Sequence, residues 1–334
     1  MFELLGLSLL LAALLTFNSL ASLIIAGVWR AGGRLTENWY AASRARLLFF
    51  LRILPALFAV LFVAFLLLPA YLVHEPRHTA ESVSLKLGLL AVLSATGIGV
   101  SLYRAYATHR ATAQLTSDWL RQGKPVKIDG IKIRSYEIEH QFPLIGIVGF
   151  FRPRLFIARQ VLELLTPEEI SAAIAHENGH LAARDNLKRG VLQACRDALL
   201  IIPSGRSLDK AWSEASEEAA DENAARQGHT VALDLASALV KIARIIPLGA
   251  RPTMPAGVFL LGVEESKGIL SRVRRLLALA TADRGGASRS DLFASLVVWA
   301  PALLLLGGFV VGATSPQLLS QVHGVIEHVV SALS

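Results

Sequence analysis

The sequence predicts a mainly α-helical membrane protein with four transmembrane helices and a folded α+β segment between the third and the fourth. Of the 334 residues, 53% are hydrophobic, and the mean hydropathy of +0.50 exceeds that of ordinary soluble proteins. Four apolar runs are long enough to cross a bilayer core of about 30 Å, which takes about 20 residues in a helix. Strand-like alternation and a capped helical pattern occur between the third and fourth runs.

The predicted spans cover residues 4–28, 53–73, 87–103 and 292–313. The first run is too long for the core of a signal peptide and lacks a basic amino-terminal region, so we expect a retained helix. The third run is short and contains several Gly, Ser and Thr residues, so a buried helix is the alternative there. None of the runs contains Asp or Glu, which argues against a proton- or ion-coupled transporter.

Basic residues near the span ends predict the orientation of the chain. The first loop is flanked by Arg30, Arg34, Arg44 and Arg46. In the second loop Arg77 is offset by Glu75 and Glu81, so the first loop is expected in the cytoplasm. The chain then returns to the cytoplasm at Arg104 and leaves it after Arg284. The segment between these two arginines is therefore expected to lie inside the cell.

The net charge of +7 is compatible with nucleic acid or with a membrane surface as partner. The arginines are spread along span flanks and helices, and no nucleic-acid-binding motif accompanies them. We therefore expect membrane lipid and no nucleic acid. The single cysteine, Cys195, cannot form an intrachain disulfide, which fits a reducing compartment, although a small buried apolar side chain is the alternative interpretation.

A small sheet is predicted ahead of the central helix. The segments 126–128 and 131–133 alternate around Asp129-Gly130, which predicts a tight β-hairpin. A further strand is expected at 154–158. The segment 144–148 is either a plain core strand or a free edge to which an extended peptide adds through backbone hydrogen bonds.

A helix is predicted to begin at Pro167, since Thr166 supplies a capping hydroxyl and Glu169 a carboxylate at the third helical position. This helix contains His176-Glu177-Asn178-Gly179-His180, the H-E-x-x-H pattern of zinc-dependent peptidases. With about 3.6 residues per turn, His176 and His180 lie on one face and can share a metal ion. The alternative is a pair of histidines on an ordinary helix.

A second predicted helix carries Glu217-Glu218-Ala219-Ala220-Asp221. Glu217 and Asp221 are four residues apart, so one can reach a zinc ion while the other hydrogen-bonds the outer nitrogen of a ligand histidine. Glu218 is the competing ligand candidate. A solvated acidic helix face is the alternative, although the surrounding alanines favour burial.

The tail after the fourth span, residues 315–334, is predicted to form an amphipathic helix on the outer membrane surface, because its apolar residues recur at helical spacing. His323 and His328 in this tail are candidate ligands or pH sensors. They are five residues apart and have no evident partner, so we expect both to be solvated.

These motifs together resemble the integral-membrane gluzincin zinc metallopeptidases. The resemblance rests on the H-E-x-x-H, on the E-x-x-A-D that follows it, and on three leading spans with one trailing span. The sequence is most similar to the BlaR/MecR-type sensor-transducer peptidases, with the HtpX and CAAX-prenyl-protease types as relatives. The similarity runs from 149–153 through Arg184-Asp185 to Asp221, and more weakly over 271–277. BlaR-type proteins carry a penicillin-binding sensor domain after the last span, and the tail is too short for one.

The resemblance implies a zincin-like α+β metallopeptidase domain facing the cytoplasm of a bacterial cytoplasmic membrane. The implied division is residues 1–110 for three transmembrane helices with a basic loop, 111–290 for the peptidase domain, 291–314 for the fourth span and 315–334 for the tail. The implied activity is endopeptidase cleavage of a cytoplasmic or membrane-proximal protein, in signal transduction or protein quality control. A sensor or repressor protein is an implied partner.

The resemblance also favours Glu217 over Glu218 as the third ligand, so that His176, His180 and Glu217 hold one Zn2+ per chain. Glu177 is expected to be the general base that takes a proton from a zinc-activated water and delivers it to the leaving amine. Asp221 is expected to orient a ligand histidine.

Three residues have weaker roles in this scheme. Asp185 either orients a histidine or caps the next helix. Arg226 and His229 are candidate oxyanion donors, against surface placement as the alternative. The alternative to an enzyme is a latent membrane transducer that uses the fold for binding, but it would have no chemical need for Glu177.

Overall fold

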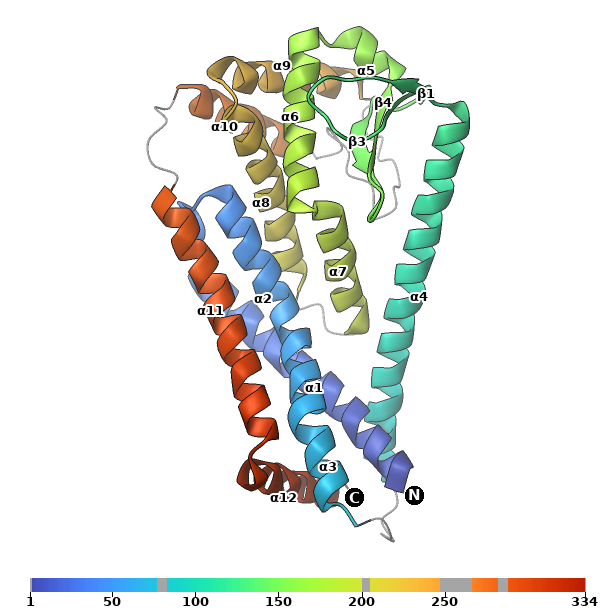
Figure 1. Ribbon diagram of the computed structural model, residues 1–334, viewed down its shortest axis with the longest axis vertical. Coiled ribbons are helices and arrows are strands. Elements are labelled where there is room, and N and C mark those ends of the chain that lie inside the picture. Colours follow the sequence, from blue (N-terminus) through green and yellow to red (C-terminus); the bar gives the residue numbers. More distant parts are fainter. Residues whose placement is uncertain (1, 77–82, 200–204, 247–265, 282–287, 334) are drawn as a thin grey trace.

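The computed structural model describes all residues except 1, 77–82, 200–204, 247–265, 282–287 and 334. The protein is mainly helical, at 81%, with a small mixed sheet. Figure 1 shows an elongated molecule in which long helices occupy one end and the sheet lies among shorter helices at the other. Arg77, Glu81 and Arg284, which entered the orientation argument, lie outside the described residues.

The helices are α1 (Phe2–Gly32), α2 (Ala41–Phe62), α3 (Leu68–His74), α4 (Leu85–Gln122), α5 (Arg159–Leu164), α6 (Pro167–Ala183), α7 (Asp185–Ala198), α8 (Arg206–Ala225), α9 (His229–Ile245), α10 (Ser266–Thr281), α11 (Ser288–Ala313) and α12 (Pro316–Leu333). A 3-10 turn, η1 (Gly33–Thr36), follows α1, and a π-helical turn, η2 (Val63–Leu67), joins α2 to α3. The strands are β1 (Lys124–Val126), β2 (Ser135–Ile138), β3 (Ile145–Val148) and β4 (Arg154–Ala158).

Three helical stretches are long and apolar enough to cross a membrane: Phe2–Thr36, Ala41–His74 and Leu85–Gln122. They contain the first three predicted spans. The segments Trp299–Ala313 and Pro316–Ala332 qualify only as a pair bent by 89°. The fourth span therefore remains a prediction.

Two of these helices extend beyond the predicted spans. Helix α2 begins at Ala41, so Arg44 and Arg46 lie on its first turns and not in a loop. Helix α4 continues without a break through residue 110 to Gln122. Apolar side chains on α4 such as Leu89, Leu102 and Tyr103 are 62%, 67% and 71% exposed. This exposure favours a lipid-facing span over a buried helix.

The sheet has the strand order β1-β2-β4-β3, with β2 parallel to β4 and the other two pairs antiparallel. The predicted strand at 154–158 is confirmed as β4, and the segment 144–148 contains β3, which lies at an edge. The pairing register turns the backbone N–H and C=O of Ile145 and Ile147 away from β4.

The predicted hairpin around Asp129-Gly130 is wrong. Strand β1 pairs instead with β2, and residues 127–134 form the connection between them. A turn does form at Asp129-Gly130, where φ of Gly130 is +86°. Ile128, Ile131 and Ile133 pack against the hydrophobic core, so their burial in the core takes the place of strand pairing.

The core of the sheet end lies between the strands and helices α6 and α9. Leu155, Phe156 and Ile157 of β4 are fully buried, and Ile174 of α6 and Leu239 of α9 pack in the same cluster. This packing fixes α6 against the sheet.

The amino terminus of α6 has the predicted capping box. The hydroxyl of Thr166 accepts a hydrogen bond from the N–H of Glu169 at 3.3 Å, and the Glu169 carboxylate accepts one from the N–H of Thr166 at 2.9 Å. The same carboxylate accepts hydrogen bonds from Ser237 at 2.7 Å and Lys241 at 2.8 Å, both on α9. Glu169 thus joins the start of α6 to α9.

Helix α8 is attached to α2 by charged side chains. Arg52 Nε donates to Asp209 Oδ1 at 2.9 Å, and the N–H of Ala41 donates to Glu222 Oε2 at 3.2 Å. Arg52 is 3% exposed, so this pair is largely shielded from water. Helix α8 is therefore held against a candidate membrane span.

We expect Glu169→Gln to lower the thermal stability at neutral pH. Glutamine still caps Thr166, so the substitution removes mainly the charge that faces Lys241. Burial opposes ionisation of Glu169, but hydrogen bonds from Lys241, Ser237 and the Thr166 N–H together lower its pKa. Its charge then stabilises the fold above the unfolded-state pKa, and this contribution is lost as the pH falls through the folded-state pKa.

The measurement is the midpoint of thermal unfolding as a function of pH. The difference in unfolding midpoint between wild type and variant should shrink toward acid pH. Each kcal/mol of lost unfolding free energy corresponds to a shift of about 2–4 °C. The control is Glu163→Gln, an exposed helix partner of Arg159, which should change the midpoint little. An equal deficit at neutral and acid pH would contradict the role of the Glu169 charge.

Candidate metal centre

Helix α6 carries His176 and His180 four residues apart, so both imidazoles lie on one face of the helix. Both are buried, at 0% and 4% exposure. The two Nε2 atoms are 3.1 Å apart. The predicted pairing of the two histidines on one helical face is thus present.

Helix α8 places Glu217 opposite the two histidines. Its carboxylate oxygens lie 3.7 Å from His176 Nε2 and 3.7 Å from His180 Nε2. One ligand atom from each of the three residues lies within 4.8 Å of the others. The close approach depends on Gly179, because a Cβ there would lie 3.0 Å from Ala220 Cα on α8.

Two further carboxylates hold the outer nitrogens of the histidines. Asp221 Oδ1 lies 2.9 Å from His176 Nδ1, and Asp185 Oδ2 lies 2.8 Å from His180 Nδ1. These carboxylates favour the tautomers in which Nδ1 carries the hydrogen, so that both Nε2 lone pairs point toward Glu217. Asp185 is the first residue of α7 and lies against His180.

This donor set fits a zinc ion. Two unprotonated Nε2 atoms facing each other at 3.1 Å repel unless a cation lies between them. Two nitrogen ligands of a tetrahedral zinc are about 3.3–3.4 Å apart, given Zn–N distances of about 2.0–2.1 Å. Two imidazoles and one carboxylate are also a common ligand set of catalytic zinc, because they leave a position open for water.

Arg272 on α10 binds the carboxylates on the α8 side of the centre. Its guanidinium donates to both oxygens of Asp221, at 2.7 and 2.9 Å, and to Glu217 Oε2 at 2.9 Å. Burial opposes ionisation of Asp221, but the Arg272 guanidinium and the hydrogen bond from His176 hold its pKa well below the usual range. Arg272 is itself only 4% exposed. It therefore fixes the position and charge state of Asp221.

The sequence assigned no role to Arg272, although it lies in the stretch 271–277 that contributed to the resemblance. The available signal was an arginine on the apolar side of α10, four residues before the buried Leu276. A charge at such a position requires a buried partner.

Glu177 lies beside the three ligand candidates and is fully buried. Its Oε2 accepts a hydrogen bond from the N–H of Ile147 at 3.2 Å, whereas Oε1 has no hydrogen-bond partner among the described residues. Burial raises the pKa of Glu177 to about 8, and the Glu217 carboxylate adds to the shift. One oxygen is thus fixed to β3, and the other is buried without a hydrogen-bond partner among the described residues.

The two histidines are shifted in opposite directions. Burial lowers the pKa of His176, and this favours the neutral imidazole that binds a metal. For His180, burial also opposes the charged form, but Glu217 and Asp185 outweigh it and raise the pKa.

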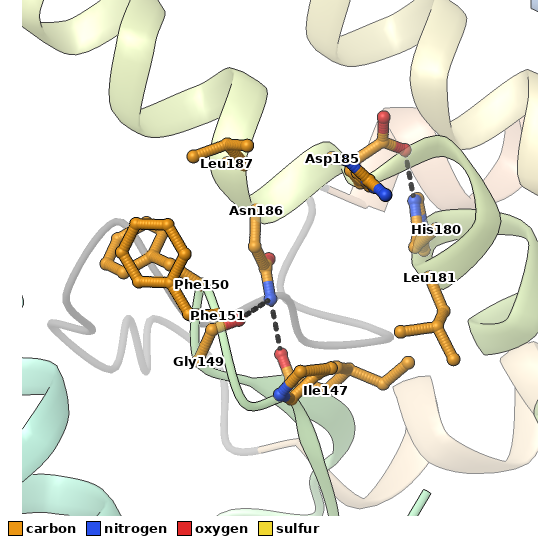
Figure 2. Close-up of a pocket in the computed structure, with 11 residues that line it drawn as sticks. Ile147, Gly149, Phe150, Phe151, His180, Leu181, Asp185, Asn186 and Leu187 are labelled. Atoms are coloured by element: carbon orange, nitrogen blue, oxygen red, sulfur yellow. Dashed lines mark hydrogen bonds and ion pairs between the residues drawn. The ribbon is translucent and has the colours of Figure 1, made fainter. Parts of the chain in front are cut away.

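A cavity of about 380 Å³ opens beside His180. Figure 2 shows Asp185 and His180 on one side and the β3 end with Phe150 and Phe151 on the other. Asn186 bridges the two sides, since its Nδ2 donates to the Ile147 carbonyl at 2.9 Å. The cavity therefore joins the ligand helix to the edge strand and has an aromatic wall.

The remaining candidates lie away from the centre. Glu218 pairs with Arg275 at 2.8 Å and with Arg44 at 3.8 Å, so it faces away from the histidines. Arg226 is exposed, and so is His229, whose Nδ1 lies 2.6 Å from the Ala280 carbonyl. Both occupy the surface positions that were the alternative to an oxyanion role.

Residues 147–249 match the model of peptidase family M48. The matched segment is less than half of the chain and contains His176, Glu177, His180, Glu217 and Asp221. The match supports a zinc metallopeptidase of this family and leaves the BlaR/MecR and HtpX subtypes open. A search of curated proteins finds no match.

We expect Gly179→Val to weaken zinc binding and to destabilise the fold, because the added side chain pushes α6 from α8 and moves Glu217 away from the histidines. Overpacking of this kind costs about 1–3 kcal/mol. Zinc retention after dialysis and the midpoint of thermal unfolding are the measurements. Gly179→Ala, whose Cβ meets Ala220 at 3.0 Å, should have a smaller effect.

The control is Gly99→Ala on α4, where no described atom lies within 4 Å of an added Cβ. This variant should retain zinc as the wild type does. Normal zinc retention by Gly179→Val would show that the α6–α8 distance does not set the ligand geometry.

Proposed function

We propose that the chain is a membrane-anchored, zinc-dependent endopeptidase in which His176, His180 and Glu217 bind one Zn2+. The convergence of these three ligand atoms within 4.8 Å, beside Glu177, whose Oε1 has no hydrogen-bond partner among the described residues, carries the proposal. The match to peptidase family M48 supports it. The class of substrate is a protein or peptide.

Zinc, when bound, supplies a Lewis acid that acidifies a water molecule and polarises a carbonyl oxygen. The chain itself moves the proton. Glu177 Oε1 accepts it from the attacking water and passes it to the leaving amine, while the Ile147 N–H holds Oε2 in place.

Asp221, Asp185 and Arg272 act as positioning residues in this proposal. Asp221 and Asp185 orient the two imidazoles through Nδ1, and Arg272 keeps Asp221 ionised and in place. Outer partners of this kind are worth about 10–100-fold in metal affinity. They prepare the centre without touching the substrate.

The substrate is proposed to bind as an extended segment beside β3. This strand lies at the sheet edge and turns the backbone of Ile145 and Ile147 outward. The Ile147 groups are already bonded to Glu177 and Asn186, so pairing would involve the adjacent part of the edge. The cavity walled by Phe150 and Phe151 would accept an apolar side chain.

The proposed organisation keeps the four segments 1–110, 111–290, 291–314 and 315–334, with the catalytic segment in the cytoplasm. Three candidate spans and the basic residues at the start of α2 support this arrangement. Substrates would then be cytoplasmic or membrane-proximal proteins in signalling or quality control. A sensor or repressor protein would be the partner if the chain is of the BlaR/MecR type.

The competing function is a latent transducer that binds zinc without proteolysis. The fully buried Glu177 argues against it, because burying a carboxyl whose Oε1 has no hydrogen-bond partner among the described residues costs stability, and zinc binding alone does not need this residue. Cleavage of a substrate distinguishes the two functions.

We expect Glu177→Gln to lower proteolysis of an unfolded protein substrate by about 10²–10⁴-fold, the usual contribution of a general base. Zinc content should stay at the wild-type level, because glutamine occupies the same volume. The measurement compares zinc content and cleavage rate of the detergent-purified chain. His176→Ala and Glu217→Ala should instead lose zinc together with activity.

The matched control is Glu218→Gln, which is next to the ligand on α8 but faces Arg275. It should retain both zinc and activity. Undiminished cleavage by Glu177→Gln would refute the assigned base, and full zinc content without Glu217 would refute the ligand set.

A further inference from the structure

A second group of potential metal ligands lies at the opposite end of the molecule from the peptidase centre. Glu75, at the end of α3, meets His323 and Glu327 of α12, and one ligand atom from each lies within 4.8 Å of the others. Figure 1 shows α3 and α12 together at the end away from the sheet. The prediction that His323 is solvated and without partners is therefore wrong, since α12 folds back against α3.

The imidazole of His323 lies between the two carboxylates. Its Nδ1 is 3.9 Å from Glu75 Oε2 and its Nε2 is 3.5 Å from Glu327 Oε1. Its Nδ1 is shielded from solvent and has no hydrogen-bond partner among the described residues. The 3.9 Å separation is too long for a hydrogen bond. A buried nitrogen of this kind calls for a proton acceptor, a donor or a cation.

The side chains have the burial expected of a site that an ion can enter. The side chain of Glu75 is 3% exposed and that of His323 is 18% exposed, whereas that of Glu327 is 50% exposed. Glu327 is thus the donor in contact with solvent.

The arrangement repeats the design of the peptidase centre. His323 and Glu327 are four residues apart on one helix face, as His176 and His180 are, and the third donor comes from another element. One imidazole nitrogen with two carboxylate oxygens suits Zn2+ and similar divalent transition ions, whereas Ca2+ and Mg2+ prefer oxygen ligands alone.

We propose that Glu75, His323 and Glu327 form an exchangeable binding site for a divalent transition-metal ion of the zinc class. The ion links α12 to the end of α3. Three protein donors leave a coordination position for water, as in zinc sites with an open position. Leu319 and Ile326 already hold α12 in place through apolar contacts in a cluster of buried side chains. The ion adds a polar link to these contacts.

The test uses the untagged, full-length chain with His176→Ala and His180→Ala, which removes two donors of the peptidase centre. In this background zinc can no longer bind at the peptidase centre. A result that refutes the second site therefore leaves the proposed peptidase function untouched, and the reverse also holds. The chain is stripped with a chelator and titrated with Zn2+ alone, and bound metal is measured after equilibrium dialysis. We expect saturable binding of about one ion per chain.

Adding His323→Ala or Glu75→Gln should weaken this binding about tenfold or more, comparable to the loss of a metal-site partner. The control is His328→Ala on the same helix, whose exposed ring is bonded to the Gly324 carbonyl at 2.8 Å. This variant should bind zinc as the background does. Glu75→Gln preserves side-chain volume and keeps the test decisive if His323→Ala folds poorly.

Two results would overturn the proposal. One is a background chain that binds no zinc in a saturable manner. The other is binding that persists unchanged in both His323→Ala and Glu75→Gln, or that falls equally in His328→Ala, because the metal would then be held elsewhere.

Discussion

The close contact between α6 and α8 is the constraint on which the rest of the structure depends. Gly179 presents only a hydrogen to Ala220, so the backbones approach closely enough for Glu217 to face the histidine pair. The contact also buries acidic side chains of α8, which would destabilise the fold without Arg272. Packing and charge compensation are thus two aspects of one arrangement, with Asp221 common to both. The attachment of α8 to α2 places this arrangement beside a candidate membrane span.

Local patterns carried most of the information that the sequence could provide. The capping box at Thr166 and Glu169 depends on four neighbouring residues, and the structure contains it. The histidine pair likewise needs only helical periodicity, which is a property of one helix. The choice of Glu217 over Glu218 came from the family resemblance, and Glu217 is the one of the two that lies opposite the histidines. Glu218 is bound to Arg275 and faces away from the histidines.

The features that the sequence missed all depend on contacts between distant segments. Asp129-Gly130 was a strong local turn signal and does turn, but the isoleucines around it pack into the core, so no tight hairpin forms. Arg272 acquires its partners only when α10 packs beside α8. His323 gains Glu75 because α12 turns back by 89° from the preceding helix. No periodicity within a single segment encodes such encounters.

The central claim is that His176, His180 and Glu217 hold a zinc ion. The most direct measurement is anomalous X-ray diffraction at the zinc edge from crystals of the full-length chain grown with zinc. The account predicts an anomalous peak at about 2.0–2.2 Å from His176 Nε2, His180 Nε2 and a carboxylate oxygen of Glu217. A zinc-replete crystal in which these three side chains are ordered but no peak lies between them would contradict it.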